Sequence, residues 1–197
     1  MKIRKKQNGM KLIELMLACA MGSVLLMVLA SVFASGMNTS NRIGQQLNFD
    51  SEFHDLGQFI RNDLRRAGFS IEGKNAGTVK WEDSPLAVYV NAAQDCVAYA
   101  YEFTDGGAEK IRFSSLYVNE ESELILYTLM QSVTATPKNI ASACAGGEAI
   151  TVNAEILLTN FVVDVSQYPL VAVAMSARSP VNGSQDDIQL NVAVMNN

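Results

Sequence analysis

The segment NGMKLIELMLACAMGSVLLMVLASVF, residues 8–33, decides the fold of this chain. From Leu12 to Phe33 every residue except Glu14 is apolar or small. A helix of this length spans roughly 33 Å, which exceeds the hydrocarbon thickness of a bilayer, about 30 Å. The segment therefore predicts a membrane helix. An unpaired carboxylate buried in hydrocarbon costs several kcal/mol, so we expect Glu14 to have a role beyond anchoring.

A short basic segment, MKIRKKQNG, precedes the apolar run. By the positive-inside rule its lysine and arginine side chains stay on the cytoplasmic side, which places the rest of the chain on the exported side. A cleaved secretory signal has a shorter apolar run of about 7–15 residues, followed by a small-residue cleavage site. This run is longer, and residues 35–38 give only weak support for a cut, so we expect the helix to be retained.

The charge of the chain limits its partners. Its 197 residues carry a formal net charge of −5, which becomes −9 when the four basic residues of positions 1–9 are removed. Nucleic acid binding rests on lysine and arginine side chains that neutralise phosphates. The acidic composition therefore argues against nucleic acid as a partner of the exported part.

A helical pattern continues beyond the apolar run. Apolar residues recur at helical spacings, with polar residues on the other faces. They are Ile43, Leu47, Phe53, Leu56, Ile60, Leu64 and Ala67. Gly68 follows two arginines, which is typical of a helix end, because cations favour the negative end of the dipole and glycine adopts the left-handed cap. We predict one helix from Met10 to about Ala67, with Gly36 and Gly44 as places where it bends or melts.

Short β-rich runs, separated by polar and glycine-rich turns, follow the helix. They are Thr78–Trp81, Leu86–Val90, Val97–Phe103, Lys110–Tyr117, Leu124–Met130, Ile156–Val165, Leu170–Ala177 and Ile188–Val194. The stretch KIRFSSLYVNEESELILYTLM predicts a β-hairpin around the turn NEES. The predicted fold is α+β, with the amphipathic half of the helix packed on a mainly antiparallel sheet.

Three cysteines divide between the two parts of the chain. Cys19 lies in the apolar helix, where a thiol behaves as a small apolar group. Cys96 and Cys144 lie in the exported part, where an oxidising compartment favours a disulfide. The chain-entropy model gives such a bridge roughly 4 kcal/mol. Two separate free thiols are the alternative.

No motif in the sequence predicts an enzyme. The sole histidine, His54, lies on the amphipathic helix without a nucleophile motif such as GxSxG. One histidine and two distant cysteines do not make a zinc site. Neither GxxxxGK[ST] nor GxGxxG occurs. Asp186 and Asp187 lack the spacing of an EF-hand loop and are expected in a solvated turn. We therefore expect no catalytic residue, no metal site and no cofactor.

One concentration of positive charge lies outside the N-terminal segment. It consists of Arg61, Arg65, Arg66 and Lys74. We expect a solvated helix end there, and an intersubunit salt bridge is the alternative.

The stretch KKQNGMKLIELMLACAMG resembles the N-terminal signature of type IV prepilins and pseudopilins. That signature is a basic leader ending in glycine, followed by an apolar helix with glutamate at its fifth residue. The resemblance implies that a membrane prepilin peptidase cuts the Gly9–Met10 bond and methylates the new amine of Met10. Met10 and Lys11 depart from the phenylalanine and the threonine or serine that are commonest at these positions, and the extra charge of Lys11 bears on packing in a filament.

The resemblance also gives Glu14 a role. Cleavage creates a cationic amine at Met10, and methylation keeps its charge. When the helices bundle in a filament, Glu14 of one subunit can neutralise the Met10 amine of a neighbour. A paired carboxylate is tolerated in a low-dielectric core while an unpaired one is costly, so this pair would set the axial register.

Looser similarities point to a subtype. The segments RNDLRRAGF, CVAYAYEF, EILLTNFVVDVSQY and the C-terminal VAMSARSP and VAVMNN resemble PilW-type minor pilins. Such proteins help to prime pilus assembly and sit at or near the tip, with roles in adhesion, twitching or DNA uptake. The J-type minor pseudopilin of a type II secretion system is the closest alternative. A membrane-anchored periplasmic binding protein or enzyme is the alternative from another class.

The implied organisation has three parts. Residues 1–9 are the leader peptide, residues 10–36 the membrane and polymerisation half of the helix, and residues 37–197 the periplasmic globular domain. This last part comprises the helix of residues 37–67 and a β-rich region, residues 78–195. The implied partners are the prepilin peptidase, other minor and major pilins and the inner-membrane assembly platform. The chain would reside in the inner membrane before assembly and then on the cell-surface pilus.

Overall fold

A long N-terminal helix followed by antiparallel sheets makes up the computed structural model, which describes residues 10–71, 79–152 and 154–194. This α+β layout confirms the predicted pilin-like fold class. The chain divides into two compact units, residues 1–45 and residues 46–197. Helix α1, Met10–Leu64, contributes to both units.

The part of α1 in the first unit exposes its apolar side chains. The large side chains of its apolar run, including Leu12, Leu26 and Phe33, are all exposed. Helical structure continues through Gly36 and Gly44, so the expected local melting is absent from this described helix. An apolar surface that runs all round a helix needs lipid or other helices to cover it.

The part of α1 in the second unit, residues 46–64, buries one face. Phe49, Phe53, Ile60 and Leu64 are almost or fully buried at helical spacings. Leu47, predicted on this face, is exposed, as is Ile43. Six residues separate Leu47 from Phe53, a rotation of about 240° beyond one full turn at 3.6 residues per turn, so Leu47 lies on another face. That prediction was wrong, and Phe49 belongs to the core in its place.

The helix ends at Leu64, three residues before the predicted end. The next turn is tighter, because the amides of Arg66 and Ala67 donate to carbonyls three residues back instead of four. Gly68 then adopts a positive φ of 79°, and its amide donates to the carbonyl of Ala100 at 2.8 Å. The glycine stop therefore also ties the end of the helix to a strand.

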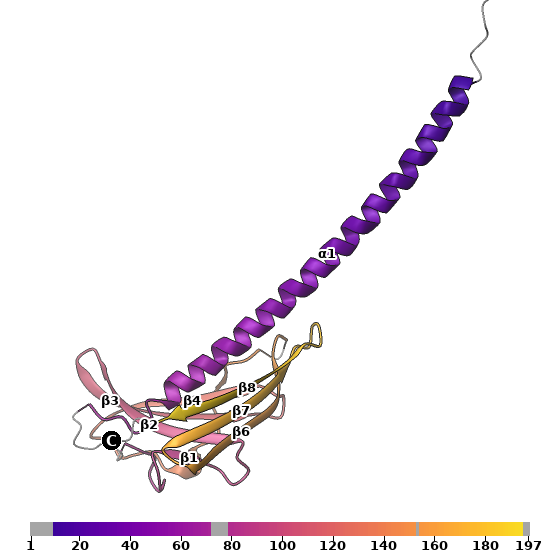
Figure 1. Ribbon diagram of the computed structural model, residues 1–197. Helices are drawn as coiled ribbons and strands as arrows, with labels where there is room; N and C mark the ends of the chain where they lie inside the picture. The colour runs from indigo at the N-terminus through magenta and orange to yellow at the C-terminus, as the bar shows by residue number, and fades with distance from the viewer. Residues whose placement is uncertain (1–9, 72–78, 153, 195–197) are drawn as a thin grey trace, which may run out of the picture. The chain divides into compact units, whose positions relative to one another are not determined.

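Eight strands form two sheets in the described residues. The five-stranded sheet has the order β1-β2-β3-β4-β5, and the three-stranded sheet the order β6-β7-β8. Their bounds are β1 Val88–Val90, β2 Cys96–Asp105, β3 Ala108–Val118, β4 Leu124–Ser132, β5 Glu148–Ala149, β6 Leu157–Gln167, β7 Leu170–Arg178 and β8 Gln185–Ala193. A short 3-10 helix, Ile140–Ser142, lies between β4 and β5. All pairings within the sheets are antiparallel (Figure 1).

Seven of the eight predicted β runs correspond to these strands. The predicted hairpin is confirmed, with Val118 opposite Leu124 and Leu116 opposite Leu126 across the turn. The predicted strand Thr78–Trp81 is wrong in its described part, where Val79 makes only an isolated bridge to Gly68. Thr78 lies outside the described residues. The short β5 was not predicted.

Two apolar clusters cover the two faces of the five-stranded sheet. Val97, Tyr99 and Tyr101 of β2 belong to the larger cluster, with the buried face of α1 and the three-stranded sheet. The alternate residues Ala98 and Ala100 belong to a smaller cluster around Trp81 and Phe113. Alternate side chains of a strand point to opposite faces, so β2 is covered on both sides. Residues 79–81 belong to the segment that was predicted as a strand. They instead cover one face of the sheet, through the side chains of Val79 and Trp81.

Candidate functional site

The N-terminal end of α1 carries the residues that the prepilin resemblance singles out. Met10 is the first residue of the helix, and Gly9 lies outside the described residues. Glu14 follows four positions later in the helix and is exposed. Among the side chains that the structure describes, which begin at Leu12, none forms an ion pair with its carboxylate.

The helix that carries Glu14 is long and apolar enough to cross a membrane. Its most apolar stretch has a mean hydropathy of 2.4, and none of that stretch is buried within the chain. A core helix of a soluble protein would be mostly buried, so the exposed surface indicates membrane anchoring.

A disulfide joins Cys96 to Cys144 in the second unit. It links the first residue of β2 to the segment that follows the short 3-10 helix. The amide of Cys144 also donates to the hydroxyl of Ser115 on β3 at 3.3 Å. Cys19 is free and exposed on α1. The bridge therefore fixes the start of the loop that runs to β5.

A buried polar cluster lies between α1 and β2, and sequence reasoning missed it. Asp63, on the buried face of α1, accepts hydrogen bonds from the hydroxyls of Tyr99 at 2.5 Å and Tyr101 at 2.8 Å. Bonds to a charged acceptor contribute about 1.5–3 kcal/mol each. A polar residue at a helical spacing from Ile60 on an apolar face was the signal that could have revealed it.

The surroundings of both tyrosines favour the neutral, protonated hydroxyl and so raise its pKa. Burial, followed by the negative charge of Asp63 and the hydrogen bonds to it, raises the pKa of Tyr101 and raises that of Tyr99 well above its usual range. The guanidinium of Arg112 lies 6.0 Å from the centre of the Tyr101 ring and opposes the shift. The cluster acts as a structural link between helix and sheet.

The basic residues at the end of α1 separate into two kinds. Arg61 and Arg65 are exposed, as expected for a solvated helix end. Arg66 is exposed as well, but its guanidinium also lies 5.7 Å from the centre of the Tyr101 ring in a cation–π contact. Lys74 lies outside the described residues.

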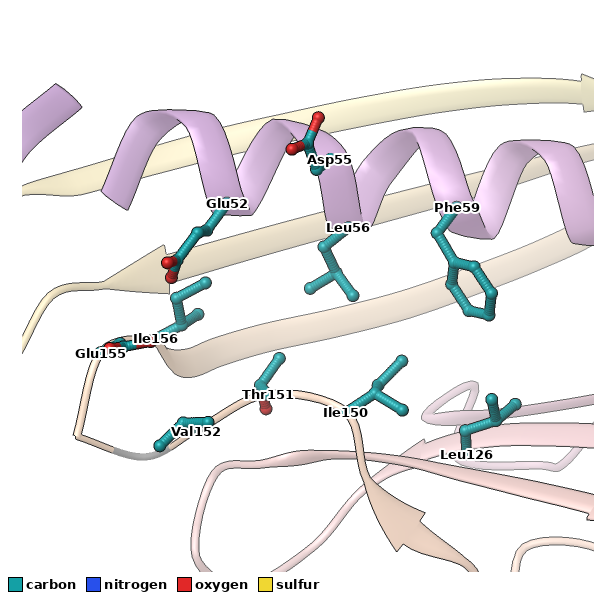
Figure 2. Close-up of a pocket in the computed structure, with 10 residues that line it drawn as sticks. All are labelled: Glu52, Asp55, Leu56, Phe59, Leu126, Ile150, Thr151, Val152, Glu155 and Ile156. Carbon is teal, nitrogen blue, oxygen red and sulfur yellow. The ribbon is translucent and has the colours of Figure 1, made fainter. Parts of the chain in front are cut away.

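A groove of about 490 Å³ opens between α1 and the loop that precedes β6. Figure 2 shows the helix above this groove and the loop below it. Its lining residues are Glu52, Asp55, Leu56, Phe59, Leu126, Ile150, Thr151, Val152, Glu155 and Ile156. All belong to the second unit. Three of these described residues are acidic, and none is basic.

Backbone contacts fix the loop side of the groove. The hydroxyl of Thr151 accepts from the amide of Leu124 at 2.8 Å, and the amide of Ile150 donates to the carbonyl of the same residue at 2.9 Å. Gly147 has a φ of 110°, and a Cβ there would lie 2.6 Å from the carbonyl oxygen of Leu126. Only glycine therefore lets the loop approach β4 this closely.

Two carboxyl groups meet at one end of the groove. In Figure 2 the side chain of Glu52 points from the helix towards Glu155 on the loop, whereas Asp55 points away from the loop. Desolvation, the negative charge of Glu155 and a hydrogen bond between the two side chains raise the pKa of Glu52. The two carboxyl groups thus lie together with no cation among the lining residues.

The other candidate residues are dispersed. His54 is exposed on α1, with its Nδ1 atom 4.0 Å from a carboxylate oxygen of Asp186. Asp186 and Asp187 lie within β8, so the predicted solvated turn is wrong at these two positions. Within residues 10–71, 79–152 and 154–194, no group of three or more His, Cys, Asp or Glu side chains could hold a metal ion.

The exposed apolar helix, joined to antiparallel sheets that pack on its amphipathic half, defines a pilin-like protein. Residues 42–194 match the family model of PpdB, prepilin peptidase-dependent protein B, and the chain belongs to this family. Membership identifies a prepilin peptidase-dependent, pilin-like protein and suggests a structural role instead of an enzymatic one. The match begins after the apolar segment, so it does not cover Gly9, Met10 or Glu14. No curated protein and no solved structure gives a significant match.

Proposed function

We infer that this chain is a minor pilin of a type IV pilus, of the PilW type. Prepilin peptidase cuts after Gly9 and methylates the amine of Met10. The mature helix, residues 10–36, holds the chain in the inner membrane, with residues 37–197 in the periplasm. On assembly this helix enters the filament, and Glu14 pairs with the Met10 amine of a neighbouring subunit.

One observation carries this proposal. An apolar, exposed helix that begins at Met10 and has a carboxylate at its fifth residue precedes a domain of a prepilin peptidase-dependent family. A simple anchor gains nothing from Glu14, because an unpaired charge opposes insertion. In a bundle of such helices, an ion pair between the carboxylate and a neighbouring amine offsets the free energy that burying either charge alone would cost.

The partners follow from the same proposal. Prepilin peptidase processes the chain, the inner-membrane platform assembles it, and other minor and major pilins surround it. The chain helps to prime assembly and occupies a position at or near the pilus tip, where it takes part in adhesion, twitching or DNA uptake. The loose likeness of RNDLRRAGF and CVAYAYEF to PilW-type pilins supports this subtype.

The intact mass of the protein tests processing. In cells with active prepilin peptidase, we expect the purified chain to lack residues 1–9 and to carry one methyl group on Met10. In peptidase-deficient cells, residues 1–9 should remain. A full-length chain in both strains would overturn the proposal.

Deletion of the gene separates the two assembly systems. Loss of surface pili with normal protein secretion is the result we expect. Loss of secretion with normal pili would instead identify the J-type minor pseudopilin of a type II secretion system.

A further inference from the structure

We propose that the groove between residues 52–59 of α1 and residues 150–152 and 155–156 is a docking site for a neighbouring pilin-like subunit, which inserts an apolar side chain beside a lysine or arginine. The inference rests on the proposed function, because the occupant is another subunit of the same assembly. It adds a contact on the globular unit that is independent of Glu14.

The floor and walls of the groove favour an apolar side chain. Leu56 and Ile156 are buried at its base, while Phe59 and Val152 leave large apolar side chains exposed. Burying apolar surface contributes about 25 cal/mol per Å². With a volume of about 490 Å³ the groove can hold one or two large side chains, within the usual range of about 300–1,000 Å³ for binding pockets.

The acidic end of the groove favours a cation. Glu52 and Glu155 face each other there, and no lysine, arginine or histidine lines the groove. A cation placed between the two carboxylates would neutralise their repulsion and form charge-assisted hydrogen bonds. The apolar floor together with the acidic end favours a partner that presents a basic residue next to an apolar one. A purely apolar ligand would leave the acidic end without a cation, and an anion would be repelled by it.

Net charge distinguishes a different subunit from a second copy. The chain without residues 1–9 has a formal charge of −9, so two copies repel each other. Opposite charge favours association and like charge opposes it. A subunit with a basic surface is therefore the better occupant.

The loop side of the groove is held in place before any partner arrives. Gly147, Thr151 and the Cys96–Cys144 disulfide fix the segment that forms this side, as described above. The amides of Glu155 and Ile156 also both donate to the carbonyl of Val152. A preformed site loses little conformational entropy on binding.

In-cell photocrosslinking tests the proposal with the full-length chain. A photoreactive benzoylphenylalanine replaces Val152 in cells that make the full set of pilin-like subunits. Val181, in the loop between β7 and β8, is the control because both valines are 58% exposed. We expect position 152 to crosslink to another pilin-like subunit within a few residues of a lysine or arginine, and position 181 to give no such product.

Charge reversal tests the acidic end. Glu52→Lys with Glu155→Lys should lower the crosslink yield at position 152 by about tenfold or more, because like charges then face each other across the interface. Glu120→Lys with Glu121→Lys, in an exposed turn, should leave the yield unchanged. Glu52→Gln with Glu155→Gln removes the charges at similar size and should give an intermediate loss.

Three results would overturn the proposal: no product at position 152, crosslinks only between copies of this chain, or a yield that charge reversal does not lower. A photoreactive residue at Ile13, on the apolar helix, separates this failure from that of the proposed function. Heterologous pilin crosslinks at position 13 without any at 152 would refute the groove alone. Their absence at both positions would refute both.

Discussion

The two units of the chain cover their apolar side chains in opposite ways. In residues 46–197, helix α1 and two sheets bury one another's apolar faces around a common core. In residues 12–45, the large apolar side chains are exposed, and the lone acidic residue among them is Glu14. The comparison indicates that the second unit is stabilised mainly by its own contacts. The first unit requires lipid or neighbouring helices.

The polar groups of the two units differ in the same way. Asp63 is buried and has two hydrogen-bond donors from its own unit, Tyr99 and Tyr101. Among the side chains described from Leu12 onwards, Glu14 has no ionic partner. The carboxylate of Asp63 thus finds its partners within its own unit. In our proposal, the carboxylate of Glu14 finds its partner in another subunit.

The largest expected effect comes from a matched pair of leucines. Leu64→Ala removes a fully buried side chain, whereas Leu26→Ala removes one that is 68% exposed. The first should lower the free energy of unfolding of the globular unit by about 2–5 kcal/mol, through lost burial and a cavity. The second should leave it unchanged. Urea unfolding of the full-length chain in detergent, followed by Trp81 fluorescence, measures the free energy of unfolding of both variants. Equal losses in the two variants would contradict the difference between a buried and an exposed part of the helix.

The disulfide gives the next largest effect. Cys96→Ser with Cys144→Ser should lower the free energy of unfolding by about 2–4 kcal/mol, because the unfolded chain regains the freedom of a long loop. Cys19→Ser, on the exposed helix, is the control and should have no effect on the globular unit. The same urea titration under non-reducing conditions compares the variants. If Cys19→Ser lowered the free energy of unfolding as much as the double variant does, the second unit would not be stabilised mainly by its own contacts.

The smallest effect is expected at alkaline pH. The folded state raises the pKa of Tyr99 and Tyr101, so it holds their protons more tightly than the unfolded state does. This contribution is complete below the usual tyrosine pKa of about 10 and is lost as the pH rises above it. The free energy of unfolding should therefore fall above pH 10, and less steeply in Tyr99→Phe with Tyr101→Phe. If the free energy of unfolding fell equally steeply with pH in the two proteins, the pKa values of these two hydroxyls would not be raised by folding.

Much of the fold could be predicted because its signals are local. An unbroken apolar run fixes the first part of α1, and alternation around the turn NEES fixes the β3–β4 hairpin. The end of the helix was predicted within three residues, since Gly68 supplies the left-handed conformation. The expected pairing of Cys96 with Cys144 came from their place as the two cysteines of the exported part, where an oxidising compartment favours a disulfide, and the structure contains it.

The features that sequence reasoning missed depend on distant contacts. The two residues of β5 are a strand only because β4 pairs with them, and Val79–Trp81 covers a sheet instead of extending it. The groove brings Glu52 and Glu155 together from segments about a hundred residues apart. No periodicity within either segment encodes these contacts. Gly9, Met10 and Glu14 come from a motif and stay predictions until processing and assembly are measured.

Incorporation of a Glu14→Ala variant into filaments tests whether Glu14 pairs with the Met10 amine of a neighbouring subunit. The amount of the chain in the membrane fraction and in sheared pili would be compared with Glu120→Ala, a control in an exposed turn. Removing one partner of a buried charge pair costs about 3–5 kcal/mol. The account predicts normal membrane levels and a loss from pili of about tenfold or more for Glu14→Ala, with no loss for Glu120→Ala. Normal incorporation of the Glu14 variant would contradict it.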